Sequence, residues 1–219
     1  MNTSPIGILD DLDQDIVNRV VMSRRNLFLN RGSLALAASV PVILAAASSE
    51  AFAGGLPKQI VDVLNFALTL EYIESAYYST ALKKGVIPAR YHAVFATIAR
   101  HESEHVNFLK SALGAAAVKP PKADFTAGGK YADVFSNFNT FLTLSQTFED
   151  LGVAAYKGQA GNLIGNGDIL TAALRIHSVE ARHAAEVRRI GGKKPWTGAF
   201  DQPKSKAQVL AAAKPFLVG

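Results

Sequence analysis

Apolar residues recur at steps of three and four along four long segments of the chain, the spacing of residues on one face of an α-helix. In the first segment the repeat runs through Ile60, Val61, Leu64, Ala67 and Leu68. The pattern predicts four helices, over roughly residues 57–84, 88–113, 133–164 and 168–190, with a break near residues 137–139 in the third.

The links between the predicted helices differ in length. Gly85 and Pro88 bound a short first link, and we expect Asp168 to cap the fourth helix after a short third link. The middle link, residues 115–132, is long and holds two prolines and a Gly-Gly pair. Two helical hairpins joined by one long crossover make an all-α four-helix bundle.

The first 53 residues have the three parts of an export signal. Arg24 and Arg25 precede an apolar stretch over residues 34–47, which is too short to cross a membrane comfortably. An Ala-Phe-Ala sequence at residues 51–53 supplies a cleavage site. The paired arginines resemble a twin-arginine signal, which implies the twin-arginine export machinery as a partner. An ordinary secretory signal and an uncleaved anchor are the alternatives.

This reading divides the chain into three parts. We predict a signal over residues 1–53, a bundle over residues 54–192 and a C-terminal tail over residues 193–219. Within the tail, residues 205–213 are expected to form a short helix and the rest a loop. The predicted location is the periplasm or the cell envelope.

The composition excludes several kinds of site. The chain has no cysteine, so a metal ion must be held by His, Asp and Glu side chains. The net charge is +5, but the basic residues are spread along the chain. Because no basic stripe with interleaved aromatic residues occurs, we expect no binding to nucleic acid.

Two Glu-x-x-His motifs occur, one in the predicted second helix and one in the fourth. Residues three apart share a helix face, so both side chains of a motif can reach one ion. A single glutamate precedes each motif by 31 residues, and the whole set repeats after 78 residues. The two sets are Glu71, Glu102 and His105, and Glu149, Glu180 and His183.

This repeated set predicts a site for two metal ions. Buried carboxylates are costly unless they are paired or bound to a cation, and two divalent ions would neutralise four glutamates. Ligands of this kind suit iron or manganese. We expect Glu71 and Glu149 as terminal ligands, Glu102 and Glu180 as bridges, and His105 and His183 as the remaining ligand of each ion.

Tyr78 and Tyr156 follow Glu71 and Glu149 by seven residues, two turns along the same helix face. One interpretation is that each hydroxyl orients a glutamate ligand through a hydrogen bond. The other is that the rings pack in the core and the hydroxyls bond elsewhere.

Other polar residues lack a repeated counterpart. Glu74 and Glu104 have Gly152 and Arg182 at the matching positions. Arg100 lies four residues before Glu104, which predicts a surface ion pair. The unmatched histidines are also interpreted as unrelated to the site; they are His92, His101 and His177.

Residues from about 56 to 190 resemble the ferritin-like superfamily, and within it the bacterial exported and desiccation-related ferritin-like proteins. The segment at residues 70–78 is similar to the first metal-helix motif of that family, and both Glu-x-x-His motifs match as well. The resemblance implies a dimetal site but leaves the reaction open, because fold does not determine function.

Three functions are compatible with these features. The favoured one is redox chemistry on oxygen or peroxide at a di-iron or di-manganese site, of the ferroxidase, peroxidase or catalase kind. The second is a non-catalytic metal-binding or storage protein, although the chain has no obvious acidic helix face. The third is a structural protein of the envelope that protects against stress. No catalytic residue beyond the metal ligands is predicted, and a homodimer is compatible with the sequence.

Overall fold

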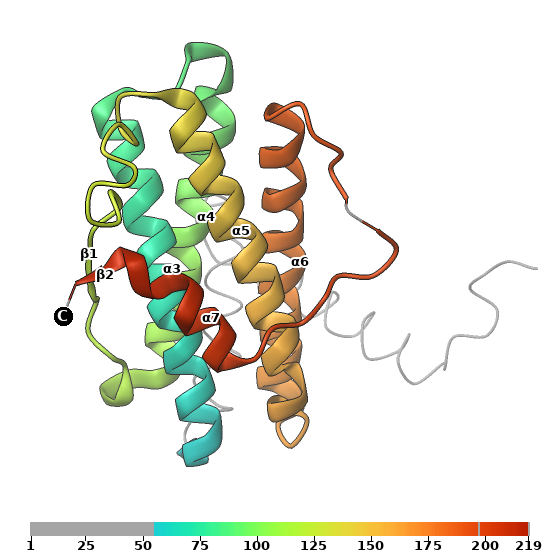
Figure 1. Cartoon of the computed structure of the whole chain (residues 1–219). Helices are drawn as coiled ribbons and strands as arrows, with labels where there is room; N and C mark the ends of the chain where they lie inside the picture. Colours follow the sequence, from blue (N-terminus) through green and yellow to red (C-terminus); the bar gives the residue numbers. More distant parts are fainter. Residues whose placement is uncertain (1–54, 197, 219) are drawn as a thin grey trace, which may run out of the picture. The chain divides into compact units, whose positions relative to one another are not determined.

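The computed structural model describes residues 55–196 and 198–218; the predicted signal over residues 1–53 lies outside the described residues. Four long helices form a bundle, in which α3 packs against α4, α5 packs against α6, and α3 also contacts α5 (Figure 1). The prediction of an all-α bundle of two helical hairpins is therefore confirmed. The long helices are α3 (Lys58–Lys84), α4 (Ala89–Leu113), α5 (Phe138–Gln159) and α6 (Gly167–Ile190).

Shorter elements lie in the links and in the tail. Strands β1 and β2 pair antiparallel, with Lys122 opposite Val218 and Ala123 opposite Leu217, so the tail is joined to the crossover. The shorter elements are the 3₁₀-helices η1 (Gly114–Ala116), η2 (Ala160–Leu163) and η3 (Lys214–Phe216), the helix α7 (Lys206–Ala213), and the strands β1 (Lys122–Ala123) and β2 (Leu217–Val218).

Two helix boundaries differ from the prediction. The third helix begins at Phe138 rather than near residue 133, because the side chain of Asn137 accepts a hydrogen bond from the Asn139 amide. The expected cap at Asp168 is wrong: Asn166 accepts the hydrogen bond of the Ile169 amide, and Asp168 lies in the first turn. In both places an asparagine takes the role of the cap.

The polar residues of the predicted site lie between two apolar clusters. Along α3, Glu71 separates Leu68, in the first cluster, from Ile73, in the second. The Leu68 cluster is formed mainly by Ile60, Leu64, Leu68, Val106, Leu109, Leu163 and Ile169. The Tyr77 cluster is formed mainly by Ile73, Tyr77, Phe95, Phe141, Phe148 and Val187.

The C-terminal tail packs across the outside of α3 and α5 (Figure 1). Ser205 caps α7 with a full capping box, which confirms the predicted short helix. Val209 of α7 is fully buried among Phe66, Leu70 and neighbours on α5. The expectation of loop for the remaining tail is wrong in part, since η3 and β2 follow α7.

Within the described part of the chain, no helix combines the length and apolar character needed to cross a bilayer.

Candidate metal centre

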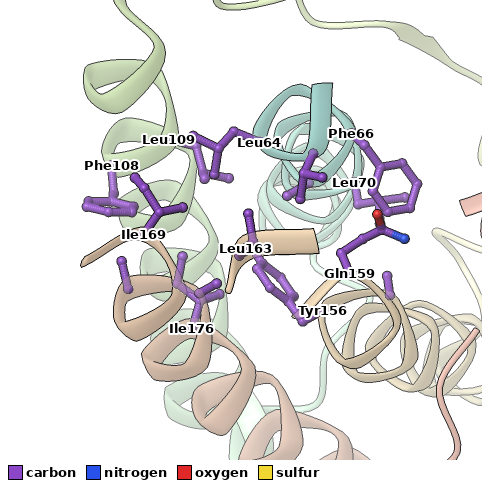
Figure 2. Close-up of a pocket in the computed structure, with 15 residues that line it drawn as sticks. Leu64, Phe66, Leu70, Phe108, Leu109, Tyr156, Gln159, Leu163, Ile169 and Ile176 are labelled. Atoms are coloured by element: carbon purple, nitrogen blue, oxygen red, sulfur yellow. The ribbon is translucent and has the colours of Figure 1, made fainter. Parts of the chain in front are cut away.

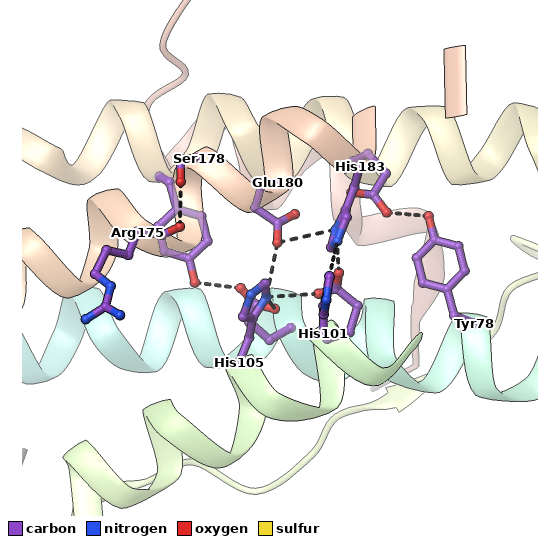
Figure 3. A network of polar contacts seen from close by, with 11 residues as sticks. Tyr78, His101, His105, Arg175, Ser178, Glu180 and His183 are labelled. Atoms are coloured by element: carbon purple, nitrogen blue, oxygen red, sulfur yellow. Dashed lines mark hydrogen bonds and ion pairs between the residues drawn. The ribbon is translucent and has the colours of Figure 1, made fainter. Parts of the chain in front are cut away.

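All six predicted ligands meet in the middle of the bundle, one or two from each long helix (Figure 3). Four carboxylates and two imidazoles form two overlapping groups, and within each group the ligand atoms lie within 4.8 Å of one another. The groups are Glu71, Glu102, His105 and Glu180, and Glu102, Glu149, Glu180 and His183. Glu102 and Glu180 belong to both groups, which is the arrangement that bridging ligands require.

The first group surrounds Nδ1 of His105. This nitrogen lies 3.2 Å from Oε2 of Glu71, 3.4 Å from Oε2 of Glu102 and 3.1 Å from Oε1 of Glu180. His105 is held by α4, and each of the two remaining carboxylates comes from another helix. Three carboxylates therefore face one imidazole nitrogen.

The second group surrounds Nδ1 of His183 in the same way. This nitrogen lies 2.9 Å from Oε1 of Glu102, 3.4 Å from Oε2 of Glu149 and 4.0 Å from Oε1 of Glu180. The repeated sequence set has thus produced two similar halves, each centred on an imidazole.

Tyr78 and Tyr156 bond to glutamates on opposite helices rather than on their own. The Tyr156 hydroxyl donates to Oε1 of Glu71 at 2.5 Å, and the Tyr78 hydroxyl donates to Oε1 of Glu149 at 2.5 Å. Burial, followed by the charge of the bonded glutamate, raises the pKa of both tyrosines well above the ordinary value. Both hydroxyls therefore keep their protons and act as donors.

Burial dominates the electrostatics of the carboxylates. Burial and the charge of Glu71 raise the pKa of Glu102 to about 7. Burial and the charge of Glu102 raise the pKa of Glu180 well above the ordinary value. Burial also opposes ionisation of Glu71, but the charge of His105 outweighs it and lowers the pKa of Glu71.

The carboxylates make both imidazoles strongly basic. Burial disfavours charge on His183, but its hydrogen bonds to Glu102 and Glu149 outweigh that cost and raise its pKa to about 10. The pKa of His105 is raised still further, because the charge of Glu71 outweighs the effect of burial. Without a metal ion, protons supply the positive charge that the carboxylates require.

The residues fit a pair of cations. Among the described residues, both oxygens of Glu102, both of Glu180 and Oε2 of Glu149 have no hydrogen-bond donor of suitable geometry. Such buried acceptors cost free energy unless a cation takes them up. Carboxylate oxygens with one imidazole nitrogen per ion suit iron or manganese.

A further carboxylate, on Glu74, lies beside the site with only 4% of the residue exposed. A Cβ atom on Gly152 would lie 3.3 Å from Oε1 of Glu74 and 3.0 Å from Oε2 of Glu180. Both carboxylates therefore occupy space that Gly152 leaves open. Burial and the charge of Glu180 raise the pKa of Glu74 well above the ordinary value, which favours its neutral form.

Sequence reasoning ranked Glu74 low because its repeat position holds a glycine. Its spacing of three residues from Glu71 was the available signal, since that spacing places both glutamates on one helix face.

His101 also contacts the site, so its interpretation as unrelated is wrong. Its Nδ1 lies 2.9 Å from Nε2 of His183, as Figure 3 shows. The signal was its position four residues before His105 on the same helix face. His92 and His177 belong to neither ligand group, and Arg100 and Glu104 form the predicted exposed ion pair at 3.0 Å.

A small apolar pocket lies beside Tyr156, at the edge of the Leu68 cluster (Figure 2). Its interior has about 20 Å³ of space for the centre of a water-sized molecule. That is little more than a single water needs. Leu64, Leu163 and Ile169 line it, so the surroundings of the Tyr156–Glu71 contact are largely apolar.

Comparison with known families agrees with the fold and the site. Residues 59–193 match the model of the ferritin-like domain, which covers more than half of the chain. The chain therefore belongs to the ferritin-like domain family. A comparison with curated proteins found no match.

Proposed function

We propose that this ferritin-like protein is exported, binds two divalent iron or manganese ions with the six ligands, and carries out redox chemistry on oxygen or peroxide. The observation that carries the proposal is the sharing of Glu102 and Glu180 by both ligand groups. A shared carboxylate pair holds two cations close enough for one small oxidant to meet both. When bound, such a pair supplies two-electron exchange with the oxidant.

The chain's own residues would position the ions and limit access to them. Tyr78 and Tyr156 each hold one oxygen of a terminal glutamate, which leaves the second oxygen of that carboxylate for an ion. The Leu68 and Tyr77 clusters exclude water above and below the site along the bundle. The pocket beside Tyr156 has room for a molecule of about the size of water, which favours a small oxidant over an organic substrate.

The test begins with protein purified from the exported fraction, whose N-terminus and metal content are measured. Two ions of iron or manganese per chain and a start after Ala53 are expected. Metal-free protein is then reconstituted with each metal, and the consumption of peroxide and of oxygen is followed. Glu102→Gln with Glu180→Gln is expected to abolish metal binding and turnover. Glu186→Gln, on a carboxylate of α6 paired with Arg189, serves as the control.

The outcomes separate the candidate functions. Two bound ions without turnover would contradict the redox proposal and favour the non-catalytic alternative. Failure of the native protein to bind either metal would overturn the metal-binding function altogether. A protein retained in the cytoplasm would contradict the export part alone.

A further inference from the structure

The imidazole of His101 meets the outer nitrogen of His183. Nδ1 of His101 lies 2.9 Å from Nε2 of His183, while the ring centroids are 5.2 Å apart and the ring planes differ by 15°. Because the nitrogens are much closer than the centroids, the rings meet edge to edge in a hydrogen bond. The opposite nitrogen of His183 faces Glu102 and Glu149.

The other half of the site has no such contact. The position that matches His101 after 78 residues is Val179, and a hydrocarbon side chain cannot accept a proton from His105. Among the described residues, the polar contacts of His105 all involve its Nδ1. The two ligand imidazoles therefore differ in their outer partners although their inner surroundings are alike.

A second difference falls on the same side of the site. Glu74 lies beside Glu180, whereas the matching position in the repeat is Gly152. The Glu-x-x-His motif of α6 thus has an extra polar neighbour at each of its two ligands. The matching neighbours of the α4 motif are a glycine and a valine.

We propose that His101 is a positioning residue that makes the two metal positions unequal, so that the position held by Glu149 and His183 binds its ion more tightly. This inference rests on the proposed dimetal function. An imidazole that binds a metal through Nδ1 carries its proton on Nε2, and His101 is placed to accept that proton in a hydrogen bond. Such a partner fixes the tautomer and orientation of the ligand and increases its basicity.

The chain offers a direct test, because the sequence repeat supplies the replacement residue. His101→Val gives the α4 half the residue that stands in the α6 half. Titration of metal-free native protein with Mn²⁺ is expected to show two separate steps. In His101→Val the tighter step should weaken by roughly 10- to 100-fold, so that the two steps approach each other.

Two further variants distinguish positioning from a general effect on structure. His101→Asn keeps an acceptor near the place of Nδ1, so it is expected to restore much of the tighter step. His92→Val replaces an exposed histidine on α4 and should leave both steps unchanged. Equal affinities for the two ions in the native protein, or an unchanged titration of His101→Val, would overturn the inference.

A second readout is independent of affinity. With Zn²⁺ as a diamagnetic probe, NMR should show a slowly exchanging Nε2 proton on His183 in the native protein. That resonance should be lost or should exchange rapidly in His101→Val; an identical resonance in the variant would contradict the proposed contact. If native protein binds two ions but His101→Val behaves like it, only this inference fails. If native protein binds no ion, the proposed function fails and this inference with it.

Discussion

The tyrosine hydroxyls link α3 and α5 in both directions, since each tyrosine bonds to the glutamate of the other helix. The sequence predicted that Tyr78 and Tyr156 belong to the site, because seven residues place them on the face of Glu71 and Glu149. It could not predict the crossed pairing, which depends on how far a tyrosine side chain reaches between two packed helices. The same limit applies to His101, whose partner lies 82 residues away on α6.

Removing either tyrosine hydroxyl should weaken metal binding without unfolding the bundle. In Tyr78→Phe or Tyr156→Phe the bonded glutamate loses its donor and becomes free to rotate, so the affinity for Mn²⁺ should fall by about tenfold or more. Competition with a chelator measures the change. Tyr72→Phe is the matched control, because its hydroxyl makes a 3.4 Å contact with the Val118 carbonyl away from the site. Affinity equal to that of native protein in both site variants would contradict the role of the tyrosines.

Gly152→Ala tests the crowding around the extra carboxylate. The added methyl group would lie 3.0 Å from Oε2 of Glu180 and 3.3 Å from Oε1 of Glu74, so a carboxylate must move. We expect a loss of about 1–3 kcal/mol in the free energy of unfolding, measured in denaturant, together with weaker metal binding. Gly161→Ala, where no atom lies within 4 Å of the added carbon, should change neither property by a comparable amount.

The elements differ in how far local sequence determines them. Repeats of apolar residues over several turns predicted all four long helices, and the turn residues beyond Gly85 and Gly114 predicted where two of them end. The strands β1 and β2 were not predicted, because two-residue strands form only when the tail meets the crossover. A pattern of period two cannot be recognised in so short a segment.

The path of the tail depends on one glycine of α5. A Cβ atom on Gly158 would lie only 1.9 Å from the backbone oxygen of Lys204, so no side chain fits there. Gly158→Ala should push the tail away from α5, lower the free energy of unfolding by about 2 kcal/mol or more, and expose the segment before α7 to proteases. Limited proteolysis followed by mass spectrometry checks this, with Gly161→Ala again as the control. Cleavage at the native rate would show that the tail does not depend on this contact.

At the scale of the whole molecule, the buried ionisable groups couple folding to pH. The pKa of Glu102 is raised to about 7 and that of His183 to about 10, and Glu180 is shifted in the same direction. Native protein therefore keeps protons that the unfolded chain has already released. The lowered pKa of Glu71 acts in the opposite direction, but only below the pH at which a free glutamate ionises.

The metal-free protein should consequently lose stability as the pH rises from about 5 to 8. Each such group contributes up to about 1 kcal/mol per pH unit, or roughly 3 °C in Tm. Thermal unfolding at several pH values in the presence of a chelator measures the trend. Because metal ions displace the retained protons, the gain in Tm on adding Mn²⁺ should increase over the same range. A metal-free Tm that rises between pH 5 and pH 8 would contradict the assignment of the retained protons.

The order of exposure around the site determines how an ion would enter. His105 and His183 are 9% and 5% exposed, whereas Glu102, Glu149 and Glu180 are completely buried. The hydrocarbon of the two apolar clusters blocks approach along the bundle axis, where a hydrated ion would have to shed its water without replacement. An incoming cation therefore meets nitrogen before oxygen, and it exchanges its water shell one ligand at a time at the imidazole edges. Loading at high concentrations of metal should then proceed at the rate at which these edges open.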